Sequence, residues 1–155
     1  MSDKLTSHIV SFGSKPENLI RAIEQKTIGS TFSTFKSHLR KGATIFLHCK
    51  SVLWGIGMVD SDYFYEEEEI WRDKTYPHRF SIKLRHLAKE PVTMCDGWYN
   101  VRLRESFGTG WAYKFIFAPK PLPGDIAADL HRDLAMQSAF SAREFVEHLA
   151  FKYKS

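Results

Sequence analysis

The segment IWRDKTYPHRFSIKL, from Ile70 to Leu84, joins an aromatic loop to the pattern of a strand. Apolar and polar residues alternate from Arg79 to His86, and this period of two predicts a strand with one face in the core. The core face carries Phe80, Ile82 and Leu84, and the outward face carries Arg79, Ser81, Lys83 and Arg85. The loop before the strand is less ordinary, because two large aromatic residues flank four polar ones.

These two aromatic residues, Trp71 and Tyr76, have two interpretations. They either plug the open end of a small barrel, or their rings form a pocket in which a flipped-out nucleobase stacks. A methyl group on the base would add apolar area to the same contact. The preceding glutamates, Glu66–Glu69, are expected to form a solvated acidic turn.

Short elements precede this segment. We expect a strand at His8–Phe12, a helix that begins at Pro16 and ends near Thr27–Gly29, a helix at Ser33–Arg40, and a hairpin of strands at Ala43–Lys50 and Val52–Val59. Ser33 is the expected N-cap of the second helix, with Phe32, Phe35 and Leu39 as its buried stripe. Gly55 and Gly57 leave one face of the last strand partly bare, which favours tight curvature of the sheet.

The second half of the chain changes character at the proline-rich segment 119–125. Before it, Trp98–Leu103 and Trp111–Phe117 are predicted to be strands joined by a turn at Gly108–Gly110. After it, helices are predicted at Ile126–Met136 and at Ala142–Phe151, the latter with Ser141 as N-cap. The pattern predicts an α+β fold, with a small curved β-barrel or sheet flanked by helices.

Composition favours one globular domain over residues 1–155, since 43% of the residues are hydrophobic. Residues 119–155 would then be a helical extension that packs on the domain or leads into a further one. Lysine and arginine number 22 against 18 acidic residues, so a polyanionic partner is plausible. No apolar run approaches the roughly 18 residues of a membrane span, and residues 1–6 lack the apolar core of a signal peptide.

The two cysteines, Cys49 and Cys95, have neither CxxC nor Cys/His spacing, so no zinc site or disulfide framework is predicted. We expect a reduced, cytoplasmic protein without metal or cofactor. His48 beside Cys49 is one conceivable catalytic group. A second is the aspartate series on the predicted helix, Asp125, Asp129 and Asp133. Without a nucleophile motif or a phosphate loop, we expect a binding domain and no enzyme.

Several motifs together resemble the YTH and EVE branch of the PUA-like superfamily. They are the Ser30–Thr31 pair after a helix, the strand GIGMV at Gly55–Val59, and W-x-x-x-x-Y-x-x-R-F at 71–80. The last resembles the W-x-x-D-K-W-x-G-x-F of YTH domains, which are readers of N6-methyladenine in RNA. YPHRFSI at Tyr76–Ile82 is closer to the YPYRFKI of EVE domains. The resemblance covers roughly residues 8–90.

The resemblance implies roles for individual residues. Trp71 matches the first tryptophan of the YTH aromatic cage and Tyr76 the second, whereas the position of a third cage wall is occupied by Ile28. Phe12 or Trp54 is then a candidate for the missing wall. Candidate hydrogen-bonding groups for the base edge are Ser30 and Thr31, which alternatively cap the second helix. Candidate phosphate-binding residues are Arg72, Lys74, Arg79, Arg85 and Lys50, which alternatively form an ordinary solvated face.

The function that these expectations support is a nucleic-acid module that recognises a modified base, expected to be methylated, in an aromatic pocket. The resemblance extends to the DNA-targeting modules of McrBC-type restriction enzymes. The chain is therefore expected to serve a modification-dependent restriction system, fused to or associated with an effector nuclease or NTPase. The alternatives are a stand-alone EVE-like sensor of a modified nucleotide and an RNA-binding reader. The residues do not separate DNA from RNA.

Overall fold

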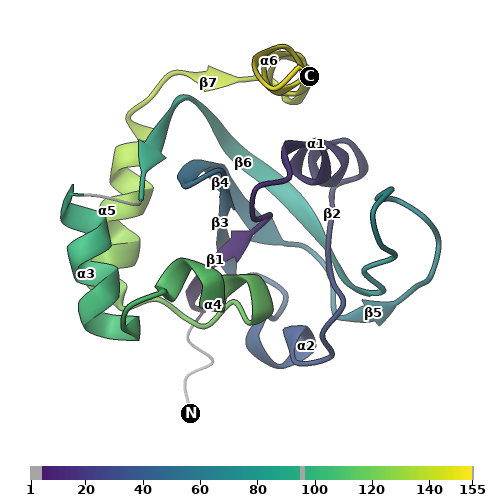
Figure 1. The fold of residues 1–155 in the computed structure, drawn as a ribbon, viewed down its shortest axis with the longest axis horizontal. Helices are drawn as coiled ribbons and strands as arrows, with labels where there is room; N and C mark the ends of the chain where they lie inside the picture. Colours follow the sequence, from purple (N-terminus) through teal and green to yellow (C-terminus); the bar gives the residue numbers. More distant parts are fainter. Residues whose placement is uncertain (1–4, 95–96, 155) are drawn as a thin grey trace.

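A curled mixed β-sheet forms the centre of the computed structural model, which describes residues 5–94 and 97–154 (Figure 1). The strands are β1 (Ser7–Ser11), β2 (Thr27–Ser30), β3 (Thr44–Cys49), β4 (Val52–Val59), β5 (Phe64–Tyr65), β6 (His78–Thr93) and β7 (Ala139–Phe140). The helices are α1 (Pro16–Gln25), α2 (Phe35–His38), α3 (Gly97–Phe107), α4 (Trp111–Phe117), α5 (Gly124–Ala135) and α6 (Ala142–Lys152).

The main strand order is β1-β3-β4-β6-β2, with β1 parallel to β3 and the other pairs antiparallel. The 16-residue β6 connects the whole sheet, because β4 and β5 pair along one of its edges while β2 and β7 pair along the other. The result is a half-barrel flanked by helices, which confirms the predicted α+β fold and the curved sheet.

The pairing of β4 with β6 is irregular at the glycines of β4. The register between these strands shifts on either side of Gly55. A Cβ atom at this position would lie 2.5 Å from the carbonyl oxygen of His86, so only glycine permits the close approach of the two backbones.

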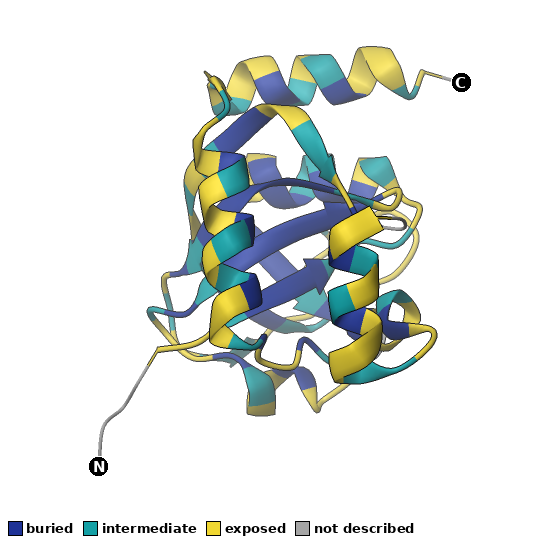
Figure 2. Cartoon of the chain, turned by 90° about the vertical axis from the view of Figure 1, so that its left-hand side faces the viewer, coloured by how far each residue is buried: buried dark blue, intermediate teal, exposed yellow. Residues whose placement is uncertain are grey.

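Both faces of the sheet are covered, which explains why β3 and β4 are almost continuously apolar (Figure 2). Ile45 and Leu47 pack in one core with α1 and α6, while Phe46 points into the other core with α3, α4 and α5. Each fully buried side chain of this size stabilises the fold by roughly 1.5–3 kcal/mol. The segment 119–155 packs on the sheet through both cores, with α5 in one and α6 in the other.

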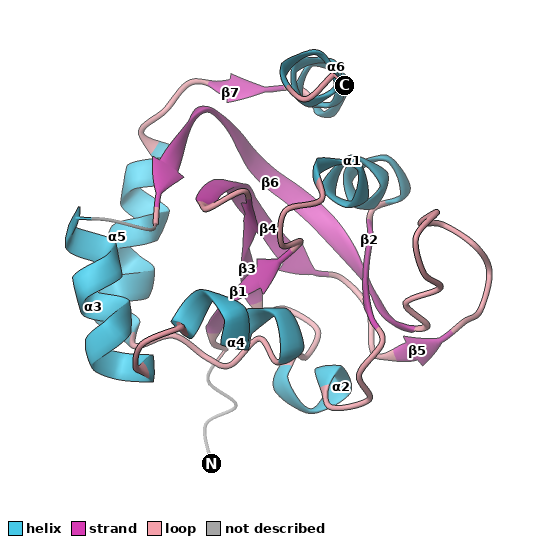
Figure 3. Ribbon diagram, viewed as in Figure 1, coloured by secondary structure: helices cyan, strands magenta, loops and turns pink. Residues whose placement is uncertain are grey.

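The predicted strands at Trp98–Leu103 and Trp111–Phe117 are wrong, because both segments are helical (Figure 3). Their aromatic and β-branched residues are typical of strands, but the buried ones follow a spacing of four: Tyr99 and Leu103, then Trp111 and Phe115. Gly108 and Gly110 have φ of 88° and 81°. The predicted glycine turn is therefore present, but it joins the helices α3 and α4 and not two strands.

Other predictions have mixed outcomes. In α6, Ser141 accepts a hydrogen bond from the Glu144 backbone and Glu144 returns one, a complete capping box that confirms the predicted N-cap. The second helix is shorter than predicted, since α2 begins after Thr34 and has no side-chain cap, so Ser33 does not cap it. Phe32 is exposed and does not belong to a buried stripe.

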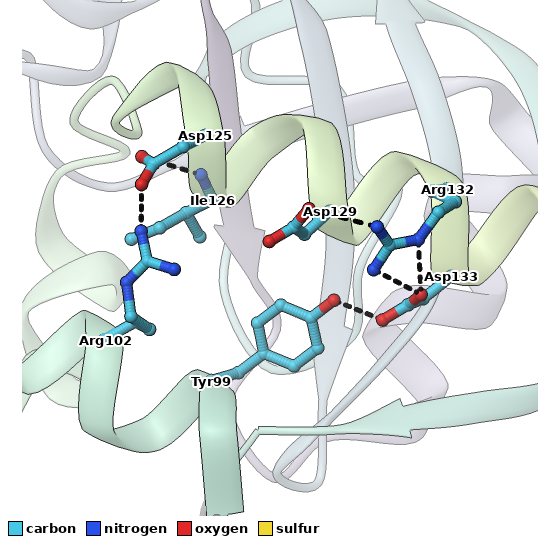
Figure 4. Close-up of polar contacts among 7 residues, drawn as sticks. All are labelled: Tyr99, Arg102, Asp125, Ile126, Asp129, Arg132 and Asp133. Carbon is cyan, nitrogen blue, oxygen red and sulfur yellow. Dashed lines mark hydrogen bonds and ion pairs between the residues drawn. The ribbon is translucent and has the colours of Figure 1, made fainter.

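Two of the three aspartates of α5 contact side chains of α3 (Figure 4). Asp133 accepts a hydrogen bond from the Tyr99 hydroxyl, Asp125 forms an ion pair with Arg102, and Asp129 pairs with Arg132 of its own helix. Each of the three carboxylates therefore has a partner within the described residues. None of the described helices is both long and apolar enough to cross a membrane.

Candidate functional site

A cavity of about 350 Å³ opens beside the aromatic loop, a volume within the range of small-ligand sites. Five segments line it: the turn after β1, the first turn of α1, the end of β2, the 71–76 loop and α4. The lining residues are Ser11, Phe12, Gly13, Ser14, Lys15, Asn18, Gly29, Ser30, Thr31, Phe32, Trp71, Lys74, Tyr76 and Ile116.

Trp71 is the most buried aromatic residue of this cavity, with only 2% of its surface exposed. Its indole Nε1 donates a 3.0 Å hydrogen bond to the backbone oxygen of Asn18, which ties the loop to α1. The ring also rests against Gly29, where a Cβ atom would lie 3.0 Å from two ring carbons. Trp71 is therefore a fixed inner wall, held in place by both α1 and β2.

Tyr76 meets the Trp71 ring edge to face, with the ring centroids 5.5 Å apart and an interplanar angle of 82°. This direct contact leaves no space for a base between the two rings, so they do not form a parallel sandwich in this structure. The backbone of Tyr76 has a φ of 49°, a left-handed conformation that costs about 1 kcal/mol or more in a bulky residue. Such strain persists only where surrounding contacts hold the residue in place.

Those contacts are supplied by a polar network at the rim. The carboxylate of Asp73 accepts hydrogen bonds from the Tyr76 hydroxyl at 2.6 Å and from Lys15 Nζ at 2.7 Å, and a longer one from Asn18 at 3.4 Å. Desolvation opposes the charge of Asp73, but these bonds outweigh it and lower its pKa to about 2. Partial burial and the bond to Asp73 raise the pKa of Tyr76. At neutral pH the Asp73 carboxylate is therefore ionised and the Tyr76 phenol is protonated.

Two serines present hydroxyl groups in the cavity lining. Ser11 Oγ accepts the Gly13 N–H and shares a 3.0 Å hydrogen bond with His48 Nδ1. Ser30 Oγ accepts the Phe32 N–H at 3.0 Å. Ser30 thus shapes the turn after β2 and does not cap α2, which resolves one of the alternatives for this residue.

The structure brings five of the six predicted pocket residues together at the cavity: Trp71, Tyr76, Ser30, Thr31 and Phe12. Trp54 is the exception, and its assignment as a cage wall is wrong. It is buried in the core under α6, where its Nε1 donates to the Cys49 backbone oxygen and its ring contacts Phe145. Trp54 is not among the residues that line the cavity.

Arg79 also differs from its prediction, because only 1% of it is exposed. Its guanidinium donates to the backbone oxygens of Tyr76, Thr75 and Glu68, and it lies 5.4 Å from the centroid of the Trp71 ring. A strand that alternates would place it in solvent, but the 66–76 loop folds back over this face and satisfies the cation with carbonyl groups. Arg79 therefore supports the aromatic loop from inside the fold.

The remaining basic candidates are exposed. Lys74 lines the cavity, and it forms no ion pair within residues 5–94 and 97–154. Arg72 pairs with Glu17 at 3.6 Å, and Lys50 lies over the Tyr153 ring; both line a neighbouring open groove between α1 and α6. Arg85 is on β6 beside Met58 and outside the cavity lining. A phosphate role for these residues stays a prediction.

Several cavity residues were not predicted from the sequence, among them Asn18, Lys15 and Ile116. Asn18 carried a usable signal, since it is a polar residue on the buried face that Leu19 and Ile23 continue in α1. Lys15 could have been placed at the N-terminus of the same helix. Ile116 was out of reach because its segment was taken for a strand.

Other chemistry finds little support in the described part of the chain. No group of three or more His, Cys, Asp or Glu side chains there is arranged to hold a metal ion. Burial raises the pKa of the Cys49 thiol to about 11, so it stays protonated and is a poor nucleophile. Cys95 lies outside the described residues.

No family model matches the sequence, and no curated protein matches it, but several solved structures have a similar fold. The Pho92 YTH domain, solved in complex with m6A, is 15% identical over 91% of this chain and 92% of its own, with a TM-score of 0.61. The YTH domain of Zygosaccharomyces rouxii MRB1, solved in complex with N6-methyladenosine RNA, is 18% identical over 89% and 92% of the two chains, with a TM-score of 0.56. The chain has a PUA-like fold of the EVE and YTH type.

The YTH-type fold extends well past the residues on which the resemblance was based. A Rhodopseudomonas palustris protein, Rpa0253, is also similar, with 12% identity over 86% of this chain and 96% of its own and a TM-score of 0.57. Each of these matches covers more than the 8–90 segment, so the C-terminal half belongs to the common architecture. In this YTH-type fold, the cavity lies beside Trp71 and Tyr76 of the aromatic loop.

Proposed function

We propose that the protein is a noncatalytic reader of a methylated base in single-stranded RNA. The observation that carries this proposal is the cavity of about 350 Å³ at the aromatic loop, with Trp71 as its inner wall and Tyr76 and Phe12 nearer the opening. Apolar walls with a few polar groups suit a flipped-out base, which regains in the pocket some of the stacking it loses in the strand.

The arrangement of the rings suggests how the base lies. Because Trp71 and Tyr76 touch each other, the base contacts the outer side of this pair and has its other face toward the Phe12 turn. Asn18 and the serine hydroxyls of Ser11 and Ser30 are near enough to the cavity to bond the base edge. A methyl group would then rest against the Trp71 wall.

The electrostatics of the opening favour a polyanion. Lys74 and Lys15 both line the cavity, and the N-terminus of α1 points its partial positive charge toward the same place. Lys15 is shared with Asp73, which leaves Lys74 as the stronger candidate for a phosphate contact. We propose RNA as the ligand, and not DNA, because the similar YTH structures of Pho92 and MRB1 were solved with m6A and with N6-methyladenosine RNA.

A titration by fluorescence polarisation tests this function. The probes are matched RNA and DNA oligonucleotides with and without N6-methyladenine, 5-methylcytosine and 5-hydroxymethylcytosine, each measured at two salt concentrations. We expect one modified RNA to bind most tightly, with affinity that falls as salt rises, because phosphate contacts release counterions. A Phe12→Ala variant should lose the preference for the modified strand.

The same titration distinguishes the alternatives. A preference for modified DNA would favour a DNA-targeting module of a restriction system, with an effector nuclease or NTPase as its partner. Tight, salt-independent binding of the modified nucleotide alone would favour a stand-alone sensor. Equal binding of all strands would contradict the reader function.

A further inference from the structure

The lining of the cavity includes two exposed apolar side chains. Phe32 is 41% exposed and Ile116 is 42% exposed, and both line the cavity. Among the aromatic residues of the lining, the exposed fraction rises from 2% at Trp71 to 41% at Phe32. An exposed apolar pair adjoining a pocket indicates a contact surface.

The position of Phe32 is fixed by its local hydrogen bonds. Its N–H donates to Ser30 Oγ, and its carbonyl accepts the N–H of Phe35 at 3.1 Å. Phe35 is buried in the core, so the turn sends one phenylalanine inward and holds the other at the cavity opening. Phe32 is therefore presented on a constrained turn and not on a loose loop.

The position of Ile116 follows from helical spacing in α4. Trp111 and Phe115 are buried against the sheet, and Ile116, one residue further, projects from a different side of the helix toward the cavity opening. Phe32 and Ile116 come from segments about 84 positions apart in the sequence, yet they border one opening. The rim is a composite surface made by the fold.

We propose that Phe32 and Ile116 form a second base-binding platform, on which the nucleotide next to the flipped base stacks. This inference rests on the proposed function. An aromatic face accepts any base, so the platform adds affinity without reading the neighbouring sequence. Lys74 at the same opening neutralises the phosphate that links the two nucleotides. The ligand is therefore a strand of at least two nucleotides, and a free nucleoside fills only half of the site.

The test compares RNA trinucleotides centred on N6-methyladenine or on 5-methylcytosine with the matching nucleosides. In each series the flanking residues are either adenines or abasic sites. For the wild-type protein we expect replacement of the stacked flanking base by an abasic site to weaken binding about tenfold. Phe32→Ala should weaken binding of the adenine-flanked strand by a similar factor, and should bind the abasic strand and the nucleoside as the wild type does.

A matched control is available on α6, where Phe151 is 83% exposed and lies outside the cavity lining. Phe151→Ala should leave every affinity unchanged. Phe32→Trp keeps an aromatic ring at the position, so it should bind the adenine-flanked strand as the wild type does. The melting temperature of each variant is measured beside its affinities, so that a loss of stability is not mistaken for the loss of a binding contact.

The outcomes separate this inference from the function on which it rests. In one set of outcomes the wild type prefers a modified trinucleotide while Phe32→Ala weakens the binding of nucleoside and strand equally, or leaves both unchanged. Either result would contradict the platform and leave the reader function standing. If the wild type shows no preference for a modified trinucleotide in either series, the reader function and the platform are both wrong.

Discussion

The hydroxyl of Tyr76 donates a 2.6 Å hydrogen bond to the carboxylate of Asp73, three residues earlier in the same loop. This bond closes the aromatic loop on itself, and Lys15 fastens it to the start of α1 through the same oxygen. The hydroxyl of a strained tyrosine at the opening of a pocket is thus linked to α1 through the Asp73 carboxylate.

Replacing Asp73 by Ala should release Tyr76 and weaken binding of the modified strand by about 1 kcal/mol, or roughly fivefold. The unfolding free energy should change by less, about 0.5 kcal/mol, since the ion pair with Lys15 is largely solvated. Binding is measured by polarisation and stability by urea unfolding. Tyr76→Phe is the matched variant, because it keeps the ring and removes the same bond; wild-type affinity in both variants would contradict a role for the network.

Gly29→Ala should destabilise the fold by about 1–3 kcal/mol and reduce binding strongly. The new Cβ would lie 2.7 Å from the Tyr76 carbonyl oxygen and 3.0 Å from the Trp71 ring, so the inner wall would have to move. Gly124→Ala is the control, because a Cβ there meets nothing within 4 Å, and it should be neutral or slightly stabilising. A variant at Gly29 with wild-type melting temperature and affinity would show that Trp71 is not held as described.

The sequence predicts the elements whose pattern is local. The alternation of β6, the bare glycine face of β4 and the Ser141 cap each depend on neighbouring residues and on one periodicity. The prediction of strands at α3 and α4 was wrong because their aromatic and β-branched residues pack against the sheet. This tertiary packing overrides the intrinsic preference of those residues for strands.

The site was predictable only in part for a similar reason. Trp71 and Tyr76 are close in the chain and belong to a recognisable motif, whereas Ile116 reaches the cavity through a helix that follows the motif by about forty residues. The predictions for Trp54 and Arg79 differ from the structure in opposite ways. An aromatic residue that looked available is in the core, and a cation that looked solvated is surrounded by carbonyl oxygens of a loop.

Arg79→Ala should destabilise the protein by about 3 kcal/mol, because three backbone oxygens of the aromatic loop would lose their donor. A phosphate contact would instead predict weaker binding with normal stability. Arg85→Ala is the control on the same strand, and since Arg85 is exposed its unfolding free energy should stay within about 0.5 kcal/mol of the wild type. Urea unfolding of both variants at neutral pH decides between the two roles.

Stability should also depend on pH through His48, which is only 5% exposed and whose Nε2 has no hydrogen-bond partner within the described residues. Burial lowers its pKa from 6.5 to about 4, so the folded protein keeps it neutral where the unfolded chain already takes up a proton. The contribution of His48 is therefore complete above pH 6.5 and is lost as the pH falls toward 4, by about 3 kcal/mol in total.

Urea unfolding at pH 7 and pH 4.5 measures this loss, which His48→Gln should reduce and His131→Gln, at an exposed position on α5, should not. Some dependence will persist in His48→Gln, because burial also lowers the pKa of His8. An unchanged pH dependence in His48→Gln would assign the effect to His8. The modified strand should bind His48→Gln less tightly as well, since His48 Nδ1 shares its hydrogen bond with Ser11 in the cavity lining.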